Sequence, residues 1–127
     1  MRMPEAQKLS QSLEDYLEMV HILCLENKDV AHVKDIAERL SVKMPSVNKA
    51  MNELKKLGLV NQEPYTGISL SPAGKQAAAK VLARHFLLRK LLLKLGVTER
   101  IANEDACKME HILSQESLDR ISDFVGG

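Results

Sequence analysis

The sequence predicts a mainly α-helical fold that contains one small two-stranded ribbon. Hydrophobic residues make up 45% of the 127 residues and aromatic residues only 3%, while the frequent leucine, alanine, lysine and glutamate favour helices. Apolar residues recur every three to four positions over most of the chain, which indicates amphipathic helices. The pattern changes at residues 59–70, where two short strand-like segments flank a turn that contains proline and glycine.

Three helices are expected in the first part of the chain. The first runs from about Ser12 to Glu26, with Ser12 as its N-cap, because short polar side chains accept hydrogen bonds from first-turn amides. The second covers Val33–Leu40. The third begins near Pro45, which suits a first helical turn, and stops at Gly58.

The hairpin and three further helices account for the rest of the chain. Strands at Leu59–Gln62 and Ile68–Leu70 form the hairpin. Ser71 and Pro72 then supply an N-cap and a proline at the first helical position, which open a long helix over Ala73–Lys94. The last two helices are expected at Glu99–Leu113 and Gln115–Phe124. We divide the chain into residues 1–72 and 73–127.

Composition limits the functional class. The net charge of +1 conceals an acidic start, a basic middle and an acidic end, an arrangement that suits contact between the middle and a polyanion. No apolar segment approaches the roughly 20 residues that cross a bilayer, and we see no signal peptide. Two cysteines are too few for a secreted disulfide scaffold. A reduced, cytoplasmic protein with no membrane partner is therefore expected.

The order helix, helix, tight turn, helix, ribbon is that of a winged helix-turn-helix module, whose third helix enters the major groove of DNA. The exposed face of this third helix carries short polar and basic side chains. Ser46, Asn48 and Lys49 are the best candidates for base contacts, because they lie near the helix N-terminus. Phosphate contacts and the remaining DNA-facing positions are assigned to Lys43, Pro45, Asn52, Lys55, Tyr65 and Thr66. A module that only binds protein is the alternative.

A second group of residues offers metal ligands. Cys107, Glu110 and His111 stand at i, i+3 and i+4 and share one helix face. Their thiolate, carboxylate and imidazole suit a first-row divalent metal, above all iron or zinc. Asp15 and Glu18 offer oxygens from the first helix, and His85 offers a nitrogen from the long helix. Each of these six residues could instead have a purely structural role, without a metal.

Other features are expected to be structural. Cys24, His21, His32 and the methionines have no comparable partners in the sequence. The chain has no glycine-rich phosphate loop, no H-E-x-x-H motif and no nucleophile elbow. We therefore expect neither an enzyme nor a small-molecule substrate.

The chain resembles the diphtheria toxin repressor and manganese transport regulator family of metal-dependent transcriptional repressors. The resemblance covers nearly the whole chain, and it is strongest at Ala106–Ser114 (ACKMEHILS) and clear at Leu13–Glu18 (LEDYLE), Asp35–Leu40 (DIAERL) and Leu70–Gly74 (LSPAG). It implies a winged-helix domain followed by a helical dimerisation domain, with metal between them. It also implies that Asp15, Glu18, His85, Cys107, Glu110 and His111 are ligands.

The resemblance also shows a hybrid ligand set. Asp15 matches the manganese-type members, whereas Cys107 matches the iron-type members. Arg89 and Asn103 replace ligands of a second, ancillary site of the iron type. The resemblance implies a homodimer that binds a palindromic operator and represses metal-uptake genes when Fe(II) or Mn(II) is plentiful. Zinc remains a possible metal, and a constitutive DNA binder with structural zinc is a further alternative.

Overall fold

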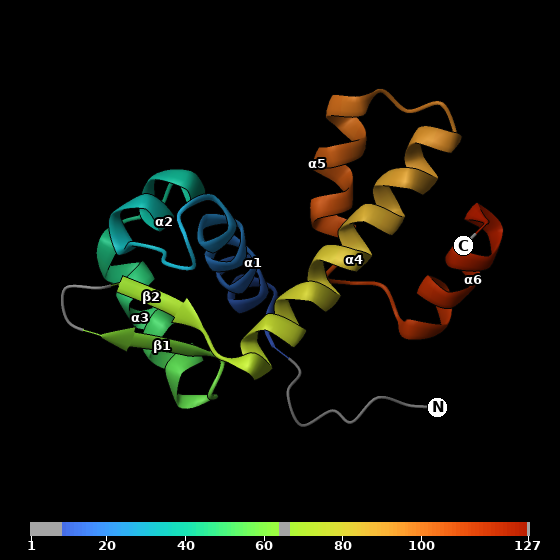
Figure 1. Cartoon of the computed structure of the whole chain (residues 1–127). Coiled ribbons are helices and arrows are strands. Elements are labelled where there is room, and N and C mark those ends of the chain that lie inside the picture. The colour runs from blue at the N-terminus through green and yellow to red at the C-terminus, as the bar shows by residue number, and fades with distance from the viewer. Residues whose placement is uncertain (1–8, 64–66, 127) are drawn as a thin grey trace. The chain divides into compact units, whose positions relative to one another are not determined.

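The structure is a computed structural model that describes residues 9–63 and 67–126 (Figure 1). Within them the helices are α1 (Gln11–Glu26), α2 (Val33–Leu40), α3 (Met44–Lys56), α4 (Pro72–Lys94), α5 (Glu99–Met109) and α6 (Gln115–Val125), and the strands are β1 (Val60–Glu63) and β2 (Gly67–Leu70). The mainly α-helical class is thus confirmed, as is the ribbon after the third helix. The chain divides into two compact units between Ala78 and Ala79, so that α4 begins in the first unit and continues in the second. No described helix combines the length and the apolar character needed to span a bilayer.

The first unit packs α1, α2, α3 and the β1–β2 sheet around one apolar core. Its fully buried side chains come from all of these elements: Leu17, Val20, Ile36, Val47, Met51, Leu54 and Ile68. The two strands are antiparallel, with Val60 opposite Leu70 and Glu63 opposite Gly67. Because one stripe of each helix is buried in this core, the opposite faces of α2 and α3 remain exposed.

The sheet has a third, one-residue partner that the sequence did not predict. Ala31 and Ile68 exchange two backbone hydrogen bonds of 2.8 Å, which fix the segment before α2 against β2. Gly67 permits this approach. Its φ is +101°, and a Cβ at this position would lie 2.8 Å from the Ala31 carbonyl oxygen.

The start of α1 differs from the prediction. The helix begins at Gln11, and the Ser10 Oγ caps it by accepting a hydrogen bond of 3.2 Å from the amide of Leu13. Ser12, expected as the cap, is an exposed residue of the first turn. Leu9 packs against the core just before the cap, so the chain enters the unit too early for Ser12 to serve as the cap.

The second unit has a smaller core, built from Leu88 of α4, Ala106 of α5 and Leu118 of α6. Helix α5 ends at Met109, four residues earlier than predicted. Ser114 is the N-cap of α6 and takes an extended conformation (φ −73°, ψ 162°). The chain must therefore leave the α5 helix before Ser114, and residues 110–112 form the turn.

The first turn of α4 lies unusually close to the end of α3. Ser71 Oγ accepts a hydrogen bond of 3.0 Å from the Gly74 amide, and the Ser71 amide donates to the Leu59 carbonyl oxygen at 3.0 Å. A Cβ on Gly74 would lie only 1.9 Å from that same Leu59 oxygen. The obstacle is a backbone atom, so a side-chain rotation cannot relieve the overlap.

We predict that Gly74→Ala destabilises the protein, although Gly→Ala inside a helix ordinarily stabilises it by up to about 1 kcal/mol. The overlap with Leu59 should cost about 1–3 kcal/mol, measurable by urea denaturation. The adjacent, exposed Ala73→Gly variant is the control and should lose only about 1 kcal/mol. A Gly74→Ala protein more stable than wild type would show that α4 and Leu59 are not in close contact.

Candidate metal centre and nucleic-acid interface

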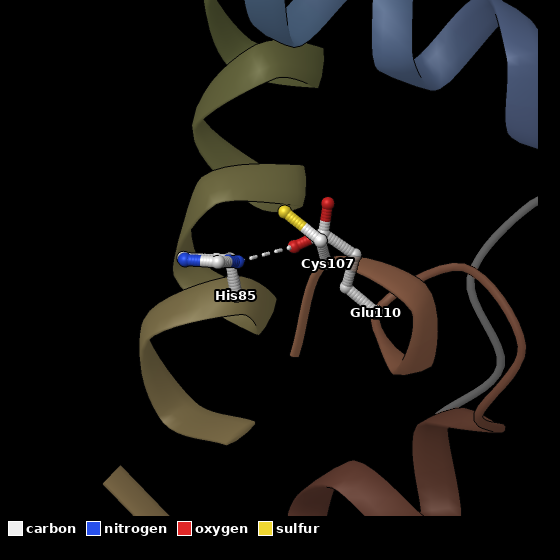
Figure 2. Close-up of side chains that lie close together, drawn as sticks. All are labelled: His85, Cys107 and Glu110. Atoms are coloured by element: carbon white, nitrogen blue, oxygen red, sulfur yellow. Dashed lines mark ion pairs between the residues drawn. The ribbon is translucent and has the colours of Figure 1, made fainter. Parts of the chain in front are cut away.

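Three side chains of different chemistry meet in the second unit. His85 comes from α4, Cys107 from α5, and Glu110 from the residue that caps the C-terminus of α5. One ligand atom from each lies within 4.8 Å of the other two. Figure 2 shows the imidazole, the sulfur and the carboxylate pointing toward one another. The helix pair thus brings together residues that are 22 to 25 positions apart in the sequence.

The carboxylate of Glu110 is the centre of this cluster. Its side chain is 1% exposed, and each of its oxygens faces a different imidazole. His85 Nδ1 lies 3.1 Å from Oε2, and His111 Nε2 lies 3.4 Å from Oε1. A carboxylate is costly to bury unless positive charge or hydrogen-bond donors surround it.

The early end of α5 changes how the last three predicted ligands are presented. Glu110 still donates its amide to the Ala106 carbonyl oxygen at 3.0 Å, so it keeps the helical spacing from Cys107. His111 lies beyond the helix. The expectation that Cys107, Glu110 and His111 share one face of a continuous helix is therefore wrong for His111, which instead reaches Glu110 from the turn.

The donor set fits a divalent transition metal. Thiolate sulfur, imidazole nitrogen and carboxylate oxygen are the protein ligands of zinc and iron, and oxygen also suits manganese. In the neutral form an imidazole has one nitrogen lone pair that can face a cation. A divalent ion among these atoms would neutralise the buried carboxylate and use the lone pairs that converge on it.

Asp15 and Glu18 belong to α1 in the first unit, where both are half-buried. They stand at i and i+3 and so lie on the same side of the helix. Glu18 Oε2 is buried and has no hydrogen-bond partner among the residues that the structure describes. A buried carboxylate oxygen in this state is a strong candidate for contact with a cation.

The two cysteines have different environments. Cys107 is exposed, and its sulfur belongs to the cluster described above. Cys24 is buried in the core of the first unit, where burial, with a smaller contribution from the negative charge of Asp29, raises the pKa of its thiol. The Cys24 sulfur points to the Ile68 carbonyl oxygen at 3.9 Å, in agreement with the structural role expected for it.

The exposed face of α3 carries the predicted DNA-contacting residues. Val47, Ala50, Met51 and Leu54 are buried, which turns the opposite side of the helix to solvent. All seven predicted residues in and just before this helix are exposed: Lys43, Pro45, Ser46, Asn48, Lys49, Asn52 and Lys55. Lys55 also borders an open groove beside the wing, together with Asn61 and Ser69 of the strands. The predicted contacts at Tyr65 and Thr66 lie outside the described residues.

Met44 is a surface residue that the sequence analysis assigned to a structural role. It is the first residue of α3 and is 49% exposed, whereas Met51 in the same helix is completely buried. The helical repeat alone does not reveal this difference, because Met44 precedes buried Met51 by two turns as well as exposed Asn48 by one; its exposure follows from its place at the first position of the helix.

Comparison with known proteins places both units in one family. The family described as "Iron dependent repressor, N-terminal DNA binding domain" matches residues 8–68. Its companion, "Iron dependent repressor, metal binding and dimerisation domain", matches residues 71–127. The two matches together leave few residues of the chain unassigned.

Individual relatives agree with this result. The chain is 40% identical over 118 residues to an uncharacterized HTH-type transcriptional regulator of Methanocaldococcus jannaschii, a match that covers 92% of this chain and 94% of the relative. It is 41% identical over 114 residues to the HTH-type transcriptional regulator MntR of Lysinibacillus sphaericus, over 90% of this chain and 81% of the relative.

A solved structure extends the similarity to the fold. The structure of a manganese-dependent transcriptional repressor in complex with manganese matches 90% of this chain with a TM-score of 0.81 and 27% identity. This chain spans only 52% of the length of that protein. The sequence matches and the shared fold lead to one conclusion: the chain belongs to the iron-dependent repressor family of metal-dependent, DNA-binding transcriptional repressors.

Proposed function

We propose that this protein represses genes of metal uptake and homeostasis when Fe(II) or Mn(II) is plentiful, with the metal as co-repressor. The observation that carries the proposal is the convergence of a thiol, an imidazole and a buried carboxylate within 4.8 Å. His85, Cys107, Glu110 and His111 would supply the ligands of the second unit. Asp15 and Glu18 would complete the set from α1, a role that the buried, unpartnered oxygen of Glu18 supports.

The donor set favours iron slightly over manganese. The sulfur of Cys107 is a softer ligand than the oxygens that manganese prefers, whereas Asp15 and Glu18 suit manganese well. The family description refers to iron, and the similar solved structure contains manganese. We infer that Fe(II) is the physiological metal, that Mn(II) also activates the protein, and that zinc binds without being the signal.

We assign DNA binding to residues 1–72 and metal binding and dimerisation to residues 73–127. The exposed face of α3 would lie in the major groove, with Ser46, Asn48 and Lys49 at base edges and Lys43 and Lys55 at phosphates. A homodimer related by a two-fold axis requires a palindromic operator. We also propose a cytoplasmic location, which suits a relative of transcriptional regulators from Methanocaldococcus jannaschii and Lysinibacillus sphaericus.

When bound, the metal supplies positive charge and directional bonds that stabilise the DNA-binding form. It can favour that form only by binding to it more tightly than to the other forms, and DNA must then raise metal affinity by the same factor. Coupling in such systems is typically about 5- to 150-fold. The protein's part is to hold Glu110 and the two imidazoles in place before the ion arrives.

We predict that operator affinity rises about 5- to 150-fold with Fe(II) or Mn(II) under anaerobic, reducing conditions. Fluorescence anisotropy with a labelled duplex measures the effect. A chelator should release the protein from DNA while its helical circular dichroism remains, because both units have apolar cores of their own. Equal affinities with and without metal would eliminate the co-repressor role, and unfolding by the chelator would indicate structural zinc.

Glu110→Gln should weaken metal binding at least 10- to 100-fold, the loss typical even for residues that only support a ligand. The substitution removes the charge and keeps the size of the side chain, so the metal-free protein should still fold. Isothermal titration calorimetry and a thermal melt separate these effects. Glu104→Gln, an exposed position on α5, is the matched control and should bind as wild type. A normal titration of Glu110→Gln would disprove the assigned centre.

Lys49→Ala should reduce operator affinity in the presence of metal, because Lys49 is exposed on the face of α3 that we place in the major groove. Because Lys49 is placed at a base edge, its loss should weaken binding to the operator more than binding to a duplex of unrelated sequence. Lys90→Ala, an exposed position of α4 in the second unit, is the control for the loss of one positive charge. Equal losses in both variants would mean that α3 does not make the contact.

A further inference from the structure

Met44 is a large apolar side chain that the fold leaves half exposed at the start of α3. It is 49% exposed, although the core of the first unit is closed beside it by Val47 and Met51, which are both 0% exposed. The residues on either side, Lys43 and Pro45, are exposed as well. Met44 stands at the edge of the apolar stripe, two turns before Met51, and about half of its surface is left open to a partner outside the described residues.

The position of Met44 relates it to the proposed contact surface. It occupies the first position of α3, and Asn48 follows one turn later on the same side of the helix. The N-terminal residues of a recognition helix are those that reach base edges. Among the groups that base pairs present in the major groove, the C5-methyl of thymine is the apolar one.

We propose that Met44 reads the C5-methyl group of a thymine in the operator and is thus a specificity-determining residue, an inference that rests on the DNA binding proposed above. Methionine suits this task, because its flexible, polarizable side chain adapts to an apolar partner. Asn48, one turn along, has the amide that pairs with the N6 and N7 edge of adenine. Together the two residues select an A·T-containing step in each half-site.

The opposite end of the same helix provides a natural comparison. Leu57 caps the C-terminus of α3 and is 43% exposed, so it matches Met44 in exposure and apolar character. It lies beyond the last turn, away from the residues that reach base edges. If exposure alone made an apolar residue recognise thymine, Leu57 and Met44 would contribute equally.

The test removes the methyl group alone. Duplexes that bind the intact protein with Mn(II) are first selected from a random library, and each thymine of the enriched site is then replaced by deoxyuridine. We expect one thymine in each half-site whose methyl loss weakens wild-type binding about fourfold, the effect of exposing one buried methyl group. Met44→Ala should bind the thymine and uracil duplexes equally at that position, whereas Met44→Leu and Leu57→Ala should still distinguish them.

Each outcome decides a separate point. Wild-type protein that is indifferent to every thymine replacement, or Met44→Ala protein that still discriminates fourfold, overturns the role of Met44. If the same duplexes are enriched equally with and without metal, the co-repressor function is refuted. The deoxyuridine test of Met44 remains valid in that case. If no sequence is enriched, the proposed function fails and the role of Met44 fails with it.

Discussion

The buried carboxylate of Glu110 is the constraint on which the second unit depends. Its side chain is 1% exposed, and imidazoles from α4 and from the turn after α5 contact its two oxygens. A negative charge in such surroundings is stable only when positive charge or donors are placed against it. The short core of Leu88, Ala106 and Leu118 holds α4 and α5 together, and this packing keeps the donors close enough for an ion to bind.

The first unit buries one face of α3 and leaves the other exposed. The apolar stripe of α3 is fully buried against α1, α2 and the sheet, so the polar and basic positions between the buried ones face outward. The pair of hydrogen bonds between Ala31 and Ile68 and the close approach of Gly74 to Leu59 fix the wing and the start of α4 within this unit.

The sequence predicted the helices well, because these follow from local patterns. Apolar repeats located α2 at Val33–Leu40 with both ends correct, and the helix-capping pair Ser71 and Pro72 located the start of α4. Contacts between residues far apart in the sequence were harder to predict. The Ala31–Ile68 bridge, the choice of Ser10 over Ser12 as cap and the end of α5 at Met109 all depend on how segments pack, which periodicity does not contain. The distance between His85 and Glu110 likewise follows from tertiary packing.

The proposed ligands Asp15 and Glu18 would connect a bound metal to a helix that does not bind it. Both residues lie on α1, whose other side contributes Leu17 and Val20, completely buried, to the core that also contains Val47 and Met51 of α3. Protein cores are close-packed, so a change in the position or order of α1 cannot leave its packing with α3 unaltered. A ligand on α1 would therefore connect the ion to α3 through the core of the first unit. Helix α4 reaches the same core through Ala77 and Ala78, about two turns before His85.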